Sequence, residues 1–198
     1  KSPSIYIHDH YFTLDSRDNK RRSLIVRVRL EEWDKKIIRP HENTLAVTRS
    51  DRLSLLRALQ ANTSPILAMF EDKAQQIYGQ LARSAQRLPI ITSRRVNGEN
   101  HNLWAIIDTG VINQLCKSLA ELPLYIADGH HRYESALAYR AESKDAAKSK
   151  DTAANFVMME LVDFGQVGLK ILATHRLVKG IAKETLDTLT ARLEASFE

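Results

Sequence analysis

The chain has 198 residues, of which 43% are hydrophobic and 27% charged, and its formal net charge is +5 at pH 7. These values are typical of a soluble globular protein, and no apolar run approaches the ~20 residues that span a bilayer. The single cysteine, Cys116, excludes an internal disulfide and a cysteine-based zinc site, so we expect a cytoplasmic protein in which Cys116 is a buried thiol. The basic residues are spread along the chain, which is compatible with an anionic ligand but does not by itself indicate DNA binding.

The two ends of the sequence suggest a piece of a longer protein. The chain opens KSPSIYIHDH, with no initiator methionine and no apolar signal segment, and it stops at Glu198 inside a helical pattern. We therefore expect residues 1–198 to be a single α+β domain that is a fragment of a longer chain.

The first elements in chain order are a β-hairpin and a helix. Residues 4–14 and 21–33 alternate apolar and polar side chains, and DSRDNK (15–20) between them supplies the turn. Ser50 is expected to cap a helix over 51–62, where leucines share one face.

A second hairpin is predicted in the middle of the chain. A buried strand over 64–72 and a helix over 73–86 lead to it. Residues 89–96 and 101–108 are its two strands, because they flank Asn97-Gly98, a pair that tolerates the positive φ angles of a tight turn.

The last part of the sequence continues to mix helices and strands. The expected elements are helix 109–122, strand 124–127, helix 132–146, strands 155–164 and 167–178, and helix 183–197. Residues 144–154 are charged and of low complexity, so we expect a mobile linker there. No regular βαβ period is present, and we therefore predict an α+β fold with a mixed, mostly antiparallel sheet and packed helices.

Five consecutive residues, Asp128, Gly129, His130, His131 and Arg132, follow a predicted strand and open a predicted helix. A helix start presents unpaired N–H groups and the positive end of the helix dipole, so it attracts phosphate or carboxylate groups. Gly129 lets the backbone approach a ligand, and the guanidinium of Arg132 has the geometry to bind phosphate oxygens. The two histidines can transfer protons near neutral pH, and Asp128 suits a magnesium ion or a substrate hydroxyl.

Structural interpretations of the same residues stay open. Asp128 could be only the N-cap of the helix, a role that is compatible with function. His130 and His131 could be a structural pair, with one ring pointing inward and the other outward. A zinc site is disfavoured, because adjacent histidine side chains diverge and no second close histidine pair completes a site.

A second cluster, HENT (41–44), lies in a loop after Pro40, which breaks the preceding strand. Glu42 could be a general base or a metal ligand, while His41 and Thr44 could donate hydrogen bonds to phosphate. From the spacing alone, a capping arrangement ahead of the next helix is the favoured alternative.

Two smaller groups contain the other histidines. Thr174, His175 and Arg176 follow an apolar strand pattern, which repeats the placement of the first motif, and they could bind phosphate or be solvated residues at an edge. His8 and His10 share one strand face by the period of two, and we interpret them as structural because a metal needs more ligands.

HENT, ADGHHRYESALAYR and THR together resemble the family catalogued as domain of unknown function number ten-fifteen. The resemblance covers nearly the whole chain, and ADGHHRYE is its specific part. Members of the family are usually longer, so the resemblance implies that residues 1–198 correspond to the middle and later portion of such a protein. At one remove, a glycine followed by basic residues at a helix start is similar to the nucleotide-binding motif of the ParB and sulfiredoxin fold, which includes CTP-binding partition proteins and ADP-dependent serine kinases.

This resemblance implies roles for particular residues. Gly129 to Arg132 would cradle nucleotide phosphates, and Asp128 would hold Mg²⁺ or act on the acceptor. Glu42 would be similar to the carboxylate that activates the acceptor hydroxyl in the serine kinases. His130 stands where sulfiredoxins have their cysteine nucleophile, so repair of sulfinic acids is not expected.

The leading functional hypothesis is a phosphotransferase or nucleotide hydrolase that uses ATP, ADP or CTP with Mg²⁺ and acts on a small hydroxylated metabolite. In it Asp128, His130, His131 and Glu42 are catalytic, and residues 174–176 line the opposite side. The alternatives are a nucleotide-binding switch or DNA-associated module of the ParB type without turnover, and a structural module whose histidines satisfy a polar network.

Overall fold

The computed structural model describes residues 3–42, 46–95, 98–173, 177 and 179–196, without the side chains of 46–49 and 147. Its strands are β1 (Ile5–Leu14), β2 (Arg17–Arg29), β3 (Ile38–Arg39), β4 (Ile66–Phe70), β5 (Ile91–Arg94), β6 (Asn100–Ile106), β7 (Leu124–Asp128) and β8 (Phe156–Asp163). Its helices are α1 (Ala46–Leu59), α2 (Gln76–Ser84), α3 (Thr109–Ala120), α4 (His130–Glu142), α5 (Lys144–Lys148), α6 (Lys183–Asp187) and α7 (Leu189–Glu194), with 3-10 turns η1 (Trp33–Lys35) and η2 (Ala153–Asn155).

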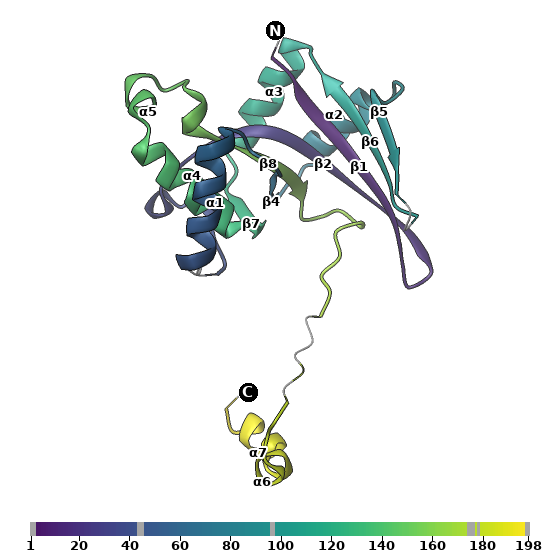
Figure 1. Cartoon of the computed structure of the whole chain (residues 1–198). Helices are drawn as coiled ribbons and strands as arrows, with labels where there is room; N and C mark the ends of the chain where they lie inside the picture. Colours follow the sequence, from purple (N-terminus) through teal and green to yellow (C-terminus); the bar gives the residue numbers. More distant parts are fainter. Residues whose placement is uncertain (1–2, 43–45, 96–97, 174–176, 178, 197–198) are drawn as a thin grey trace.

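The eight strands form one sheet in the order β3-β7-β4-β8-β2-β1-β6-β5 (Figure 1). The pairs β3–β7 and β4–β8 are parallel, and the other neighbouring pairs are antiparallel. The predicted α+β class with a mixed, mostly antiparallel sheet is therefore confirmed. Because neighbours such as β1 and β6 are far apart in the sequence, the sheet brings distant residues together.

The first predicted hairpin is confirmed, but its turn is tighter than expected. Leu14 pairs with Arg17, and the two residues between them, Asp15 and Ser16, have φ angles of 50° and 59°. Two consecutive left-handed residues form a primed turn whose twist matches that of the flanking strands. The strand β2 therefore begins in a polar stretch without apolar alternation, which is why the sequence pattern places its start too late.

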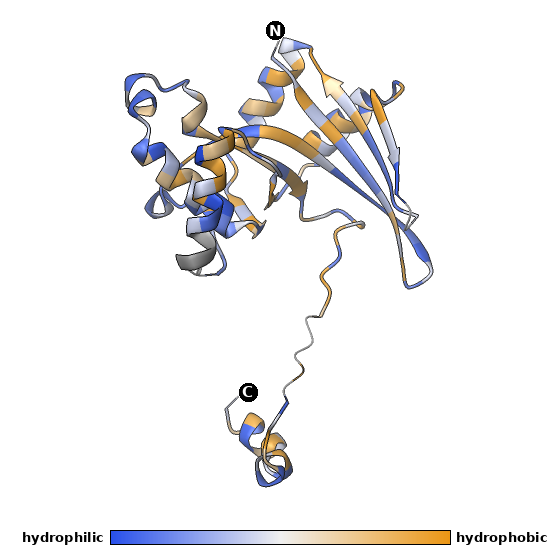
Figure 2. Ribbon diagram, in the orientation of Figure 1, coloured by the Kyte–Doolittle hydropathy of each residue, from blue (hydrophilic) through white to orange (hydrophobic). Residues whose placement is uncertain are grey.

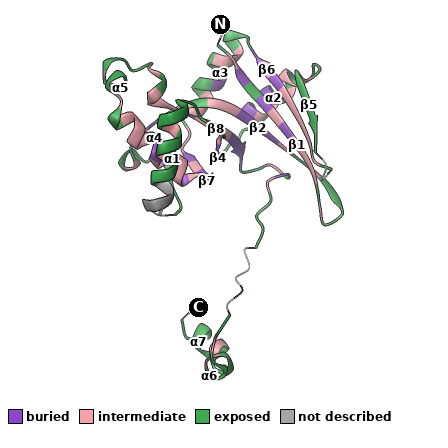
Figure 3. Cartoon of the chain, in the orientation of Figure 1, coloured by how far each residue is buried: buried purple, intermediate pink, exposed green. Residues whose placement is uncertain are grey.

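The hydrophobic core lies on one face of the sheet. Along β1, Ile5 and Ile7 are buried while Tyr6 and His8 are more exposed, so burial alternates with the strand period (Figure 3). The core continues through Leu24 of β2, Met159 and Leu161 of β8, Ile77 and Leu81 of α2, Leu115 of α3, and Tyr133 and Ala136 of α4. Each fully buried aliphatic side chain contributes about 1.5–3 kcal/mol. The alternation leaves His8 and His10 on the opposite face.

The helix α1 begins at Ala46, so Ser50 lies inside it and the prediction of Ser50 as the N-cap is wrong. The segment before Ser50 contains no glycine or proline that would stop the helix from continuing in that direction. Near the other end of α1, the guanidinium of Arg57 donates to both carboxylate oxygens of Glu142, at 2.9 and 2.6 Å, and links α1 to α4.

The predicted strand over 167–178 is wrong for its described part, because residues 167–173 contain no strand. After β8 the carboxamide of Gln166 accepts from the N–H of Arg22 at 2.8 Å and donates to its carbonyl at 2.5 Å. This side chain thus occupies backbone groups of β2 that a further strand would need. The chain then leaves the sheet (Figure 1), and the departing segment contains apolar stretches, drawn orange in Figure 2. Val167 and Ile171 in this segment are exposed.

Three other expectations differ in detail from the structure. Residues 144–154, expected to be a linker without regular structure, contain α5 and η2, while their mobility stays a prediction. The helix predicted over 183–197 is divided at Thr188 into α6 and α7. Cys116 is exposed rather than buried, because α3 turns the neighbouring Leu115 into the core.

Candidate functional site

The predicted strand–glycine–helix junction is present in the structure. The strand β7 ends at Asp128 and α4 begins at His130, with Gly129 between them at a φ of 100°. The positive φ favours glycine, and a Cβ at this position would lie 3.0 Å from the Arg132 guanidinium, which would have to shift slightly. Gly129 is the N-cap residue, which corrects the interpretation of Asp128 as a cap. Because glycine supplies no capping side chain, the positive end of α4 is not neutralised by its N-cap.

The guanidinium of Arg132 is already engaged by protein groups. It donates to Asp128 Oδ2 at 2.5 Å, to Ser64 Oγ at 3.0 Å and to the carbonyl oxygen of Pro65. These contacts tie the first turn of α4 to the residues just before β4. A phosphate at Arg132 would have to compete with Asp128, so direct phosphate binding by Arg132 stays a prediction and its observed role is to position the turn.

The imidazole of His130 is buried beneath the loop that contains His41 and Glu42. Its Nε2 accepts a hydrogen bond from the backbone N–H of His41 at 3.2 Å, and its Nδ1 lies 3.0 Å from Glu42 Oε1 without the alignment of a hydrogen bond. Burial lowers the pKa of His130, although the Glu42 charge acts in the opposite direction. The neutral ring with Nε2 as acceptor carries its proton on Nδ1, which faces the carboxylate.

The structure therefore brings the first part of HENT to the start of α4. The ring of His41 contacts that of His130 edge-on, with centroids 4.5 Å apart, and its Nδ1 donates to the carbonyl of Ile126 at 2.7 Å. The side chain of Glu42 is 52% exposed, so a bound molecule can reach this carboxylate. His131 follows on α4, where its carbonyl accepts from Ser135 Oγ.

Four predicted site residues, Thr44, Thr174, His175 and Arg176, lie outside the described residues. Their phosphate-binding roles stay predictions.

Two groups of side chains in the described part of the chain have metal-ligating atoms within 4.8 Å of one another. One is His41, Glu42 and His130, and the other is His10, Glu99 and His101. Asp128 belongs to neither group, and its carboxylate is paired with Arg132. Magnesium binding by Asp128 stays a prediction.

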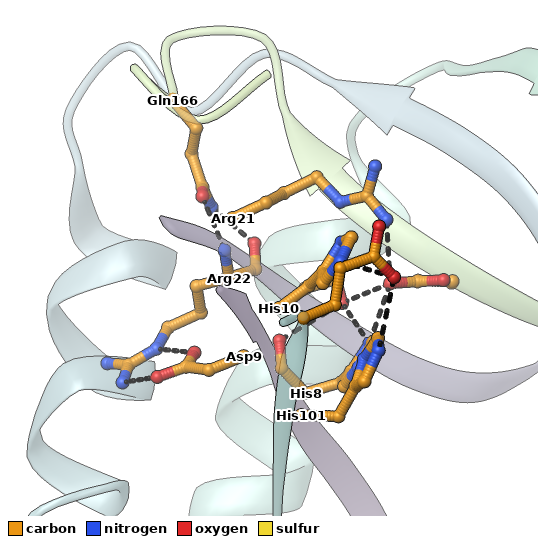
Figure 4. Close-up of polar contacts among 10 residues, drawn as sticks. His8, Asp9, His10, Arg21, Arg22, His101 and Gln166 are labelled. Carbon is orange, nitrogen blue, oxygen red and sulfur yellow. Dashed lines mark hydrogen bonds and ion pairs between the residues drawn. The ribbon is translucent and has the colours of Figure 1, made fainter. Parts of the chain in front are cut away.

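The second group is part of a histidine cluster that the sequence did not reveal (Figure 4). The rings of His10 and His101 stack with centroids 4.5 Å apart, and His8 stacks on His101 at 5.2 Å. The antiparallel register of β1 and β6 places His10 opposite His101. Burial lowers the pKa of both His10 and His101, and the nearby positive groups act in the same direction.

The carboxylate of Glu160, on β8, contacts this cluster through His8. Its Oε1 lies 3.0 Å from His8 Nδ1 and accepts from Ser23 Oγ at 2.5 Å, and Arg21 lies 3.8 Å away. Burial by itself would raise the pKa of Glu160, but these hydrogen bonds and charges outweigh it and lower the pKa to about 2. The carboxylate is therefore charged at neutral pH, and it orients the imidazole ring of His8.

A buried charge pair lies on the other face of the same strands. Arg22 donates to both carboxylate oxygens of Asp9 at 2.6 Å (Figure 4). Lys20 Nζ lies 3.0 Å from Asp9 Oδ2. Burial would raise the pKa of Asp9, but the hydrogen bonds from Arg22 and Lys20 and their charges lower it. Asp9 is completely buried, so this pair is part of the structural support of the sheet.

The sequence contains one correct signal for the histidine cluster, the shared face of His8 and His10. It gave no short-range signal for the third ring, since His101 lies 93 residues after His8. Only the pairing of β1 with β6 brings the three rings together.

The comparisons with known proteins support a single relationship. The family model described as "Protein of unknown function (DUF1015)" matches residues 1–198, and the chain therefore belongs to this family. No curated protein and no solved structure matches the chain. None of the described helices is long and apolar enough to span a membrane.

Proposed function

We propose that this member of the DUF1015 family binds nucleotide phosphates at the start of α4 and transfers the terminal phosphoryl group to a small hydroxylated metabolite or to water. The observation that carries the proposal is the 3.0 Å approach of Glu42 Oε1 to the buried His130 Nδ1, beside the glycine-capped start of α4. It joins an anion-binding element to a carboxylate that a substrate can reach.

The chemistry assigned to these residues is proton removal and charge stabilisation. Glu42 accepts the proton of the acceptor hydroxyl while the oxygen–phosphorus bond forms and the bond to the nucleotide leaving group breaks. The Nδ1 proton of the neutral His130 faces this carboxylate at 3.0 Å and favours its charged form electrostatically. The N-terminal N–H groups of α4 and a Mg²⁺ bound with the nucleotide offset the negative charge of the phosphates. The 73% exposed carboxylate of Asp128 is the proposed protein ligand of that ion.

Arg132 is a positioning residue in this proposal. By tying the turn to Ser64 and Pro65 it keeps the first turn of α4 oriented toward the loop that carries Glu42. The similarity to the ParB and sulfiredoxin fold is part of the same proposal, and it supplies ATP, ADP and CTP as the nucleotides to test.

The test is a calorimetric titration with ATP, ADP and CTP, with and without Mg²⁺, followed by turnover assays against hydroxylated metabolites. We expect Glu42→Gln to bind nucleotide as the unchanged chain does and to lose about 10²–10⁴-fold in turnover, the usual contribution of a general base. Glu142→Gln, at the far end of α4, is the matched control and should keep both properties. No binding of any nucleotide would contradict the proposal, while Mg²⁺-dependent binding without turnover would favour a nucleotide-binding switch.

A further inference from the structure

We propose that His10, Glu99 and His101 form a binding site for a divalent first-row transition metal ion, for which Zn²⁺ is the natural probe. The site lies on β1, β6 and the turn before β6, and none of these elements contributes to the site at the start of α4. It is independent of the proposed phosphoryl transfer.

The three ligand atoms would have to move only slightly closer together to coordinate one metal ion. His10 Nε2 lies 3.6 Å and His101 Nε2 4.0 Å from Glu99 Oε2, and all three atoms lie within 4.8 Å of one another. Zinc binds imidazole nitrogen at ~2.0–2.1 Å, which places the ligands of a tetrahedral ion about 3.3 Å apart. Two histidines and one glutamate are a known zinc ligand set that leaves one position for water or a substrate.

The strands hold the two imidazoles ready for this role. His10 and His101 are directly opposite in the β1–β6 ladder, and their rings are nearly parallel, at 7°. The Nε2 atoms of both rings are buried and have no hydrogen-bond partner within the described chain. A buried polar atom without such a partner destabilises the fold, and coordination to a metal would offset that cost at both rings.

A chain of hydrogen bonds also determines which nitrogen of His101 is available. The charged Glu160 accepts from Nδ1–H of His8, so the Nε2 of a neutral His8 is an acceptor. That atom lies 2.9 Å from His101 Nδ1, which must then be the donor. The lone pair of a neutral His101 is therefore on Nε2, the atom that faces Glu99. A carboxylate–histidine relay behind a ligand is the usual outer arrangement of metal-bound histidines.

A structural polar network explains these contacts less well. Such a network satisfies its buried atoms within the protein, as Glu160, Ser23 and His8 do. The two Nε2 atoms instead converge on one carboxylate, and the relay leaves the Nε2 of His101 without a proton. A metal ion uses all three groups at once.

The experiment is a Zn²⁺ titration of the chelator-treated chain against a chromophoric competitor, with Co²⁺ spectra to report the coordination. We expect one Zn²⁺ per chain and Co²⁺ bands of a four- or five-coordinate nitrogen–oxygen site. His8→Phe, which removes only the relay, should weaken binding about 10–100-fold, and His101→Gln, which removes a ligand, should weaken it further. Mg²⁺ should not compete, because imidazole ligands favour transition metals.

Control variants separate this site from other histidines. His41→Gln tests the second group of possible ligands and should leave Zn²⁺ binding unchanged. Glu99→Gln, in a turn and 31% exposed, tests the ligand set if a histidine variant does not fold. Absence of stoichiometric Zn²⁺ binding overturns the proposal, and so does binding that survives His101→Gln and Glu99→Gln or disappears in His41→Gln.

Discussion

The start of α4 and the histidine cluster on the sheet both place imidazoles beside a carboxylate, but they are assembled in different ways. At α4, Asp128 to Arg132 are contiguous, and only a loop containing His41 and Glu42 has to fold onto them. The cluster takes its side chains from β1, β2, β6 and β8, including a contact between His8 and Glu160, 152 residues apart. The first site can be predicted from a local sequence motif. The second site arises only from the register of the strands.

The two regions also differ in what supports them. The sheet site lies over strands that are joined by a buried, bidentate charge pair between Asp9 and Arg22. The α4 site depends on a left-handed glycine, Gly129, and on an arginine that ties the turn to neighbouring loops. We therefore expect charge substitutions to affect the stability of the sheet most, and a backbone substitution to affect the α4 site most.

The largest expected effect on stability is that of Asp9→Ala. The substitution leaves the buried guanidinium of Arg22 without its carboxylate, and an unpaired buried charge lowers the free energy of unfolding by about 3–5 kcal/mol. Urea denaturation followed by circular dichroism measures this loss.

The double variant Asp9→Leu with Arg22→Met sharpens the interpretation, since two apolar side chains should recover most of the lost stability. Glu142→Ala, which removes the exposed partner of Arg57, is the contrasting variant and should have a much smaller effect. A loss as large as that of Asp9→Ala would contradict the assignment of the main electrostatic support to the sheet.

The next largest effect is a pH dependence that Glu160 gives to the sheet. Its pKa is about 2 in the folded chain against an ordinary value of 4.5. Because the folded-state pKa is depressed, the stabilisation is fully present above about pH 4.5 and is lost as the pH falls toward 2, by about 3 kcal/mol in total. Unfolding measured between pH 6 and 2.5 should therefore show a shallower decline in Glu160→Gln. An unchanged decline would contradict the prediction, and the exposed Glu71→Gln controls for the loss of one negative charge.

The same contrast explains how much the sequence could predict. Alternating and helical periods identified most strands and helices, and the strand–glycine–helix junction at residues 128–132 followed from contiguous residues. The order of the strands did not follow, because pairing between β1 and β6 depends on the packing of the whole sheet. The apolar pattern of residues 167–173 wrongly predicted a strand. The backbone groups of β2 with which such a strand would pair are already bonded to Gln166. Ser50 resembled a cap because the helical pattern is clearest after it, although hydrogen bonding extends further back.

The smallest effect distinguishes the α4 site most sharply, since it depends on one backbone angle. Gly129→Ala places a Cβ on a residue with a φ of 100°, which costs about 1–2 kcal/mol, and the Arg132 guanidinium 3.0 Å away must also shift. The matched control is Gly79→Ala inside α2, where the nearest atom to the new Cβ is 3.7 Å away and alanine should stabilise the helix by about 0.5–1 kcal/mol. The two substitutions add the same methyl group, so changes of opposite sign in the free energy of unfolding, measured by heat or urea, isolate the conformational requirement at Gly129.

Equal effects would mean that the start of α4 tolerates a different turn. The preorganisation argued for the phosphate site would then lose its main structural support, while the proposed metal site on the sheet would be unaffected.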